Sequence, residues 1–491
     1  MAPHHQEYFK ELREQYVTGD TTEFSYRSPF TTFLKKIRPD CFLIEEPKRD
    51  KVFGAPDYKV FSRSHKVGYI ETKDLGLGLD ELLSKEQVKK YSKSIDNYIL
   101  TNYVRFILLR NGERVLDIHL CSPDDLRNPR FRVSPERIGE LSQLMDSFFD
   151  YVVPSITGSK QLAYHLSQKA IVIKFIAKEQ LGEDLIQVRG QGTPSSIYDF
   201  YLGLEEMIHD ISIDDCVDAY AQTITYGLFL AKIQCQGALK REMVDHCLPR
   251  NIPVIKRVFI NIAGQSLPSN MVWIVDEILD VLNATDITTI LAEMDSRGKR
   301  DKDPFSHFYE DFLSEYDSEK RERRGVYYTP RPVVNYITKS IEWALKNDFE
   351  HEMGFADDTV TVLDPAVGTG TFLWLVYLRT LGEMKRRGLG GLMRSKIQNH
   401  ILKDFYGLEV LITPYIIAHL KLALILKNWF YELQEGERVP VYLTNSLDQS
   451  EDHGVIPFLR EINEERKIAQ HWRQVNFERG VSPIALMTLI P

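Results

Sequence analysis

Two carboxylates and a lysine near the N-terminus have the types and spacing of a metal-dependent hydrolase. Residues 55–76 read APDYKVFSRSHKVGYIETKDLG, with Asp57 opening one apolar strand and with Glu71 and Lys73 two residues apart on the next. Side chains two residues apart on a strand point to the same face. Two converging carboxylates suit Mg²⁺, and a neighbouring lysine can orient an attacking water. We therefore predict Asp57 and Glu71 as magnesium ligands and Lys73 as their catalytic partner; a surface hairpin with solvated charges is the alternative.

A second pair of polar residues follows on the next predicted helix. The stretch SKEQVKKYSKSI places Gln87 and Tyr91 four residues apart, on one helix face. Two interpretations of Gln87 stay open: a catalytic group beside the carboxylates, or the last position of a capping box that starts at Ser84. The stretch YVRFILLRNGERVLDIHL then predicts a hairpin closed by Asn111-Gly112.

A glycine-rich turn later in the chain has the form of a ligand-binding loop. The stretch VTVLDPAVGTGTFLWLVYL, residues 360–378, predicts a buried strand, a turn and a helix. Gly368 and Gly370 allow close approach of a ligand, and parallel α/β sheets bind ligands where such loops follow strands. The loop lacks the Gly-Lys-Ser/Thr ending of triphosphate loops, and Asp364 would repel a pyrophosphate but attract a cationic group. A purely structural turn is the alternative.

Two more strands are predicted downstream of this loop. The stretch DFYGLEV ends a strand at Glu409, whose carboxylate can accept hydrogen bonds from ribose hydroxyls. The stretch VPVYLTNSL ends the next one near Asn445 and Leu447. Strands alternating with helices predict a parallel α/β unit.

These segments resemble the AdoMet-binding motifs of gamma-type N6-adenine DNA methyltransferases. DPAVGTGTFL resembles the glycine-loop motif, and RRGVYYTPRPVVNYITKSI (323–341) resembles the motif that precedes it. YGLEVLITPYIIAHLKLAL resembles the motif with the ribose-binding acid, and TNSL resembles the one near the adenine ring. The resemblance covers 323–450 and implies that Asp364 lies near the methionine amino group. It also implies that these residues line the AdoMet site: Tyr327, Thr329, Pro330, Asp364, Ala366, Gly368, Glu409, Asn445 and Leu447.

The catalytic tetrapeptide of that family, Asn/Asp/Ser-Pro-Pro-aromatic, does not occur in the sequence. In the family it binds the adenine amino group and stacks on the flipped base. TPYI at 413 is explained as a helix start, SPIA at 482 lacks the second proline and the aromatic, and the tail FERGVSPIALMTLIP lacks the strand expected before the motif. We therefore expect a methyltransferase domain truncated before this motif, with AdoMet binding but no methyl transfer by this chain alone.

The N-terminal constellation resembles a family as well. Pro-Asp … Glu-x-Lys is similar to the restriction-endonuclease-like nucleases, and Gln-xxx-Tyr to the nuclease domains of type I and related restriction enzymes. The whole order resembles type IIG restriction-modification enzymes, in which one chain cuts and methylates DNA. This implies a multidomain α/β protein: a nuclease domain over 1–125, a helical connector over 140–320 and an incomplete Rossmann-like AdoMet-dependent methyltransferase domain over 321–491. It further implies Mg²⁺ and AdoMet as cofactors and double-stranded DNA as substrate.

Composition limits the remaining function classes. The chain has 491 residues, too many for one ordinary core, with 43% hydrophobic residues and a net charge of -9. No apolar run is long enough for a bilayer, and the N-terminus does not read as a signal peptide, so we expect no membrane partner. Five cysteines without close spacing argue against a zinc site or disulfides and fit a reducing cytoplasm. The helical middle lacks Walker-type loops, which argues against an ATP-driven translocase.

Two alternatives to a self-sufficient nuclease stay open. One is a noncatalytic AdoMet- or DNA-binding subunit that needs a separate chain with the missing methyltransferase and target-recognition parts. The other is an inert remnant, whose truncated sheet would leave an unpaired apolar edge and predict aggregation.

Overall fold

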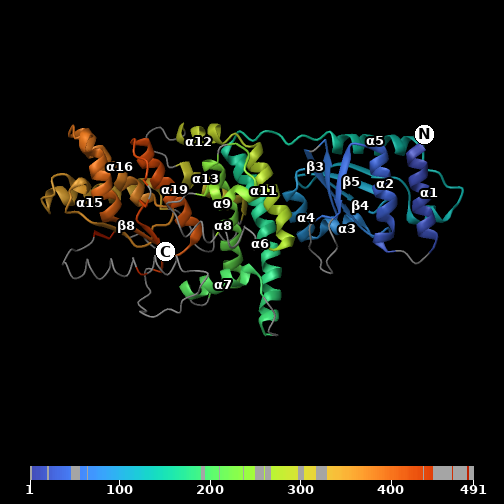
Figure 1. Ribbon diagram of the computed structural model, residues 1–491, viewed down its shortest axis with the longest axis horizontal. Coiled ribbons are helices and arrows are strands. Elements are labelled where there is room, and N and C mark those ends of the chain that lie inside the picture. Colours follow the sequence, from blue (N-terminus) through green and yellow to red (C-terminus); the bar gives the residue numbers. More distant parts are fainter. Residues whose placement is uncertain are drawn as a thin grey trace. The chain divides into compact units, whose positions relative to one another are not determined.

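The chain folds as two compact units, Met1–Ser155 and Ile156–Pro491 (Figure 1). The computed structural model describes residues 3–18, 22–45, 56–63, 65–189, 194–208, 211–235, 237–248, 259, 267–296, 304–316, 329–434, 436–445, 467 and 484–485. Both units combine a sheet with helices, which confirms the predicted mixed α/β class. The helical segment and the second sheet lie in the same unit.

A six-stranded sheet forms the centre of the first unit, with its strands side by side in chain order. The strands are β1 (Cys41–Glu45), β2 (Tyr58–Ser62), β3 (His65–Thr72), β4 (Tyr98–Thr101), β5 (Arg105–Arg110) and β6 (Glu113–His119). Neighbours pair antiparallel except β3 and β4, which are parallel. The strands predicted on either side of residues 63–64 pair antiparallel as β2 and β3. The predicted hairpin β5–β6 is confirmed, and Asn111 and Gly112 both take positive φ in its turn.

In the described part of this unit, five α-helices accompany the sheet. They are α1 (Pro3–Val17), α2 (Arg27–Ile37), α3 (Leu79–Ser84), α4 (Glu86–Ser94) and α5 (Pro135–Phe149). A parallel strand pair needs a crossover, which α3 and α4 supply between β3 and β4. The hydroxyl of Ser134 caps α5, and apolar residues at helical spacing then bury one face against β3, β5 and β6: Ile138, Leu141, Leu144, Met145 and Phe148.

Gly68 sits at a point in β3 where no side chain fits, and this gives a stability prediction. A Cβ at Gly68 would lie 2.2 Å from the carbonyl oxygen of Asn97 and 3.0 Å from the ring of Phe148. Backbone cannot move aside cheaply, so we expect Gly68→Ala to lower the free energy of unfolding of this unit by about 1–3 kcal/mol. Gly139 lies on the exposed side of α5, where a Cβ would meet no described atom within 4 Å apart from the neighbouring backbone of its own helix, and it is the matched control.

The measurement is denaturant unfolding of the full chain, followed by circular dichroism. Gly139→Ala should stabilise the same unit by roughly 0.5–1 kcal/mol, because alanine favours helix more than glycine does. Equal midpoints for Gly68→Ala and the parent protein would contradict the packing argument.

A parallel sheet forms the centre of the α/β part of the second unit. Its order is β10-β7-β8-β9, with β7 (Val362–Asp364), β8 (Phe405–Glu409), β9 (Val441–Leu443) and β10 (Ile484–Ala485). From β7 the chain moves to β8 and β9 on one side, whereas β10 pairs on the other side. The strand order therefore reverses at β7, and ligands bind at the carboxyl ends of strands at such a reversal.

The strand β10 corrects one expectation from the sequence. The tail from 477 onward was expected to lack a strand, but Ile484 and Ala485 pair in parallel with Val362 and Leu363. A strand of two residues is too short to show an alternating pattern, and its formation depends on the preformed edge of β7.

The helices of the second unit fall into two groups. The helical segment contains α6 (Ser159–Arg189), α7 (Ser196–Met207), α8 (Ile213–Gln234), α9 (Val244–Cys247), α11 (Val272–Ala284), α12 (Ile287–Ser296) and α13 (Pro304–Tyr316). The sheet is accompanied by α15 (Arg331–Asn347), α16 (Thr371–Arg386), α17 (Met393–Lys396), α18 (Leu402–Asp404) and α19 (Ile412–Asn428). Packing of α19 against both α8 and α16 joins the groups. No helix in the described ranges is long and apolar enough to cross a membrane.

Candidate functional site

Strand β7 delivers a buried carboxylate to the edge of the sheet where its order reverses. Asp364 is fully buried, and its Oδ1 accepts a hydrogen bond from the backbone N–H of Ala366 at 3.3 Å. Its Oδ2 accepts no hydrogen bond from any residue that the structure describes. Burial raises the pKa of Asp364 to about 7; the Ala366 N–H opposes this rise, and the charge of Glu409 adds to it. A buried acceptor of this kind is suited to a cationic donor.

The loop after β7 is shaped by two glycines with positive φ. Gly370 precedes α16, and a Cβ there would lie 3.2 Å from the Cβ of Ala418 on α19, so the close packing of these two helices requires glycine. At Gly368 a Cβ would meet no atom of the described chain within 4 Å. The backbone at Gly368 therefore faces open space, where a ligand can approach it.

Glu409, at the end of β8, joins this loop to the neighbouring strand. Its Oε2 accepts from the N–H of Gly368 at 2.9 Å, and its Oε1 accepts from the N–H groups of Val410 and Leu411 at 2.8 Å each. Burial raises the pKa of Glu409, and these N–H groups oppose the rise. A carboxylate has about four acceptor positions, so one stays available for a ribose hydroxyl.

The end of β9 lies next to Glu409, at the same edge of the sheet. The N–H of Thr444 donates to the carbonyl oxygen of Glu409 at 2.7 Å, and half-buried Asn445 follows directly. The structure thus brings together five of the predicted residues: Asp364, Ala366, Gly368, Glu409 and Asn445. Tyr327 and Leu447 lie outside the described residues.

The predicted Thr329–Pro330 segment directly precedes α15. Pro330 caps this helix, and its carbonyl oxygen accepts from the N–H groups of Val333 and Val334. The guanidinium of Arg331 lies over the ring of Trp374, 4.5 Å from its centroid. Since Trp374 is in the first turn of α16, this stacking brings the start of α15 to the helix that follows the glycine loop.

The residues of this region fit AdoMet chemically. The free oxygen of Asp364 suits an ammonium group, the remaining acceptor position of Glu409 suits a ribose hydroxyl, and the open side of Gly368 admits close contact. One contact here was missed by the sequence analysis: the buried Lys421 of α19 donates to the hydroxyl of Thr371, the first residue of α16, at 3.2 Å. Lys421 lies 50 residues from Thr371 in the sequence, so no local sequence pattern predicts this contact.

The first unit brings the other predicted constellation together. Asp57 directly precedes β2 and is buried, and its N–H donates to Oε2 of Glu71 at 3.2 Å. The ammonium of Lys73 forms an ion pair with Oε1 of Glu71, as expected for side chains on one face. Burial raises the pKa of Glu71, and the charge of Asp57 adds to this rise, whereas Lys73 opposes it.

Two partners of Asp57 were not predicted from the sequence. The guanidinium of Arg27, the first residue of α2, pairs with Oδ1 of Asp57. The N–H and the hydroxyl of Thr72 both donate to Oδ2 at 2.8 Å. Thr72 lies between Glu71 and Lys73 in the sequence, so its place in the motif was a usable signal, whereas Arg27 is 30 residues away.

The Gln-xxx-Tyr pair is only partly described. Gln87 lies in α4, and its side chain is outside the described residues. The hydroxyl of Ser84 donates to the carbonyl oxygen of Glu81, and α4 begins after Lys85 without a side-chain cap, so Ser84 does not start the alternative capping box. Tyr91 packs edge-on against buried Tyr98, with ring centroids 6.1 Å apart. Burial and then the charges of Glu71 and Asp57 raise the pKa of Tyr98, which places this ring beside the carboxylates.

The pair of carboxylates fits Mg²⁺ by its chemistry. Both groups supply hard oxygen ligands, and Mg²⁺ in proteins uses one or two carboxylates and retains several waters. Asp57 uses three of about four acceptor positions and Glu71 uses two, so positions stay open on both. Within the described ranges, no group of three or more His, Cys, Asp and Glu side chains is placed to hold a metal. Arg27 and Lys73 supply the positive charge next to the two carboxylates.

This arrangement predicts a metal-dependent stability for one variant. In Arg27→Met the buried carboxylate of Asp57 loses its cation, and breaking a buried ion pair costs about 3–5 kcal/mol. In EDTA, we expect Arg27→Met to melt several degrees below the parent protein. Addition of Mg²⁺ should raise the melting temperature of the variant by more than it raises that of the parent protein. Arg63→Met, which removes an exposed ion pair with Asp40, should show neither effect. An equal Mg²⁺ response in all three proteins would contradict the metal assignment.

Comparison with known proteins supplies a family for part of the second unit. The N-6 DNA Methylase family profile matches residues 300–455. The chain therefore carries an N6-adenine DNA methyltransferase domain in this range, and that family implies AdoMet as cofactor. No curated protein sequence matches the chain.

Several solved structures also match with low identity. The DrdV–DNA complex is 20% identical with a TM-score of 0.41, and the match covers 94% of this chain and 42% of that one. The ATP-dependent type ISP restriction-modification enzyme LlaBIII, bound to DNA, is 17% identical with a TM-score of 0.44, and the match covers 68% and 21%. The type IIL restriction-modification enzyme MmeI, in complex with DNA, is 17% identical with a TM-score of 0.28, and the match covers 60% and 41%. The matches span less than half the length of each of these proteins.

Proposed function

We propose that this chain is a DNA restriction-modification protein that binds AdoMet in the Asp364 loop and hydrolyses double-stranded DNA at the Asp57–Glu71–Lys73 site with Mg²⁺. The observation that carries the AdoMet part is the buried Oδ2 of Asp364, which lacks a partner among the described residues and lies at the strand-order reversal. This atom falls within the range that matches N-6 DNA Methylase.

In the cofactor site, each residue has a binding role. Asp364 accepts from the methionine amino group, Glu409 from the ribose, and Gly368 lets the backbone lie against the ligand. AdoMet supplies a methyl group when bound in such a family. The Asn-Pro-Pro-aromatic segment that contacts the target base in that family does not occur in the sequence, so the role proposed for these residues is AdoMet binding and no methyl-transfer step is assigned to them.

In the nuclease site, Asp57 and Glu71 would hold Mg²⁺, which stabilises negative charge on a phosphate when bound. Thr72 and Arg27 fix the carboxylate of Asp57 through both of its oxygens. Lys73 is held beside Glu71, where its ammonium can orient the attacking water. The pairing of Lys73 with Glu71 is the observation behind this role.

A second candidate function is a noncatalytic AdoMet- and DNA-binding subunit that acts together with a separate chain, which would supply methyltransferase and target-recognition parts. Such a subunit would still bind AdoMet, but it would cut DNA only when the second chain is present.

Calorimetric titration of the full chain with AdoMet tests the first part of the proposal. We expect one AdoMet per chain, with displacement by S-adenosylhomocysteine as a check of the pocket. Absence of binding by the folded protein would overturn the cofactor assignment. A plasmid-cleavage assay, argued in the Discussion, separates the nuclease from the subunit.

A further inference from the structure

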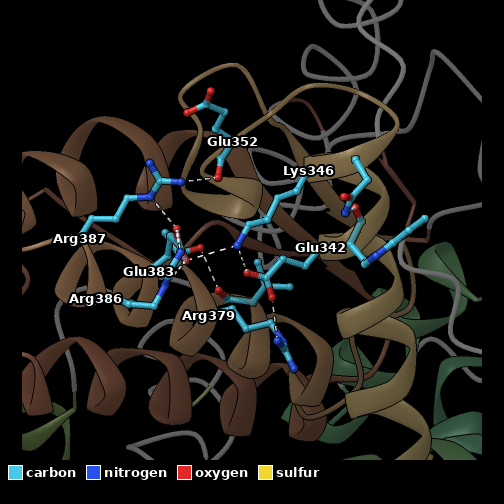
Figure 2. Close-up of polar contacts among 11 residues, drawn as sticks. Glu342, Lys346, Glu352, Arg379, Glu383, Arg386 and Arg387 are labelled. Atoms are coloured by element: carbon cyan, nitrogen blue, oxygen red, sulfur yellow. Dashed lines mark hydrogen bonds and ion pairs between the residues drawn. The ribbon is translucent and has the colours of Figure 1, made fainter.

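Helices α15 and α16 are joined by a series of side-chain contacts that run along both helices. Arg331 of α15 stacks on Trp374 of α16, and Asn335 contacts Arg379. Further along, Glu342 contacts Arg379 and Lys346 contacts Glu383 (Figure 2). The residue numbers rise together on the two helices, so the helices run parallel and begin at the same end. We call these contacts, from Arg331–Trp374 to Lys346–Glu383, the α15–α16 ladder.

Arg379 is the central member of the ladder. One nitrogen of its guanidinium donates to Oε2 of Glu342 and another to Oδ1 of Asn335, each at 2.7 Å. The side chains of Arg379 and Glu342 are 18% and 17% exposed, so bulk solvent screens this pair only in part. A guanidinium can hold two acceptors in fixed directions, which an ammonium cannot do.

The far end of the ladder is anchored by a buried carboxylate (Figure 2). Glu383 accepts from Lys346 at 3.3 Å, from Arg386 at 2.8 Å and from Arg387 at 2.7 Å, and Arg387 also donates to the carbonyl oxygen of Glu352 at 2.6 Å. Burial opposes ionisation of Glu383, but hydrogen bonds from the three cations lower its pKa to about 2. Glu383 therefore carries its negative charge at neutral pH.

Both helices begin at a predicted cofactor segment. α16 starts directly after the glycine loop, and α15 starts directly after Thr329–Pro330. Within the described chain, no backbone hydrogen bond joins Thr329–Pro330 to residues 364–370. The register between the two helices therefore sets the distance between the two segments, and the side chains of the ladder set that register.

We propose that Arg379 is a positioning residue of the cofactor site: it holds α15 in register with α16 and so keeps the Thr329–Pro330 segment in place against the glycine loop. The inference rests on the proposed function for the identity of the ligand. Loss of Arg379 removes the two hydrogen bonds from its guanidinium to Asn335 and Glu342. The contacts at the two ends of the ladder, Arg331–Trp374 and Lys346–Glu383, remain. The start of α15 then gains freedom that AdoMet must remove on binding, which weakens affinity.

The test compares Arg379→Met and Arg379→Lys with Lys174→Met. Lys174 forms a partly buried ion pair with Asp218 between α6 and α8 of the same unit, so its loss is a matched control for general destabilisation. Two quantities are measured for each full-length protein: amide hydrogen exchange of 331–336 and 366–370 without ligand, and the AdoMet dissociation constant. We expect Arg379→Met to speed exchange in both segments and to weaken AdoMet binding at least tenfold, with Arg379→Lys intermediate and Lys174→Met unchanged in both.

The two readouts distinguish this inference from the cofactor assignment. Unchanged exchange in both segments of Arg379→Met would overturn the positioning role, whether or not AdoMet binds. Faster exchange together with no AdoMet binding by the parent protein would support the positioning of the segments and overturn the cofactor. An equal loss of affinity in Lys174→Met would show general destabilisation and would also overturn the role of Arg379.

Discussion

Asp364→Asn should weaken AdoMet binding by one to two orders of magnitude while making the free protein more stable. A charged hydrogen bond contributes about 1.5–3 kcal/mol, so the loss of the charge alone weakens binding by roughly 10- to 150-fold. In the absence of ligand, the same charge is buried without a second partner among the described residues. Its removal should therefore raise the free energy of unfolding at pH 8 by on the order of a few kcal/mol.

The pH dependence follows from the sign of the pKa shift. The pKa of Asp364 is raised from 3.8 to about 7 by burial, so the folded state binds a proton more tightly than the unfolded state does. Proton binding by Asp364 therefore stabilises the folded state. This contribution to the free energy of unfolding is fully present below pH 3.8 and is lost as the pH rises from 3.8 through 7. Binding of a cation needs the ionised form, so AdoMet affinity should fall as pH is lowered from 7.5 to 6.

Calorimetry and thermal unfolding at pH 6, 7 and 8 measure both effects. AdoMet binding near pH 6.5 should release a proton, which titration in buffers of different ionisation enthalpy detects. Asp348→Asn, a change at an exposed carboxylate of the same unit, is the control and should alter neither binding nor its pH dependence. An Asp364→Asn protein that binds AdoMet as tightly as the parent would remove Asp364 from the site.

The cofactor region was predictable because its residues are local in sequence. The run from Val360 to Phe372 contains its own strand, turn and helix signals, and the structure has β7, the two positive-φ glycines and α16 there. Glu409 was placed correctly at the end of β8 by the same reasoning. Its three backbone donors were not predictable, because they depend on how the loop folds back over β8.

Long-range contacts were the part that the sequence did not indicate. Arg27 reaches Asp57 across 30 residues, and Arg379 reaches Asn335 across 44. Arginines are common on helix surfaces, so no pattern marks these two as different from solvated ones. The strand β10 was not predicted for a related reason. It consists of two residues, and these are recognised as a strand only because they pair with β7, which is far away in the sequence. Sequence reasoning thus located side chains on neighbouring strands and in the loops that follow them, and missed the arginines of α2 and α16, which make their contacts through tertiary packing.

Lys73→Ala and Glu71→Ala should each reduce Mg²⁺-dependent cleavage of unmethylated plasmid DNA by at least about 100-fold. Groups that position or activate the attacking water contribute roughly 10²–10⁴ in rate. Glu71→Ala also removes one of the two proposed metal ligands, and Lys73→Ala leaves the buried Glu71 without its cation. Lys10→Ala and Asp124→Ala, at exposed positions of the same unit, are the matched controls and should cut like the parent protein.

The raised pKa of Glu71 adds a pH signature to this result. A proton competes with Mg²⁺ for a carboxylate whose pKa is raised by burial, so the Mg²⁺ concentration needed for half-maximal cleavage should decrease as pH rises from 6 to 8. The same assay with and without AdoMet shows whether the Asp364 pocket regulates cutting. Cleavage that survives in both variants would come from a contaminant or from another site. Complete absence of cleavage by the folded, AdoMet-binding protein would leave the second unit as the functional part and favour the subunit that depends on a separate chain.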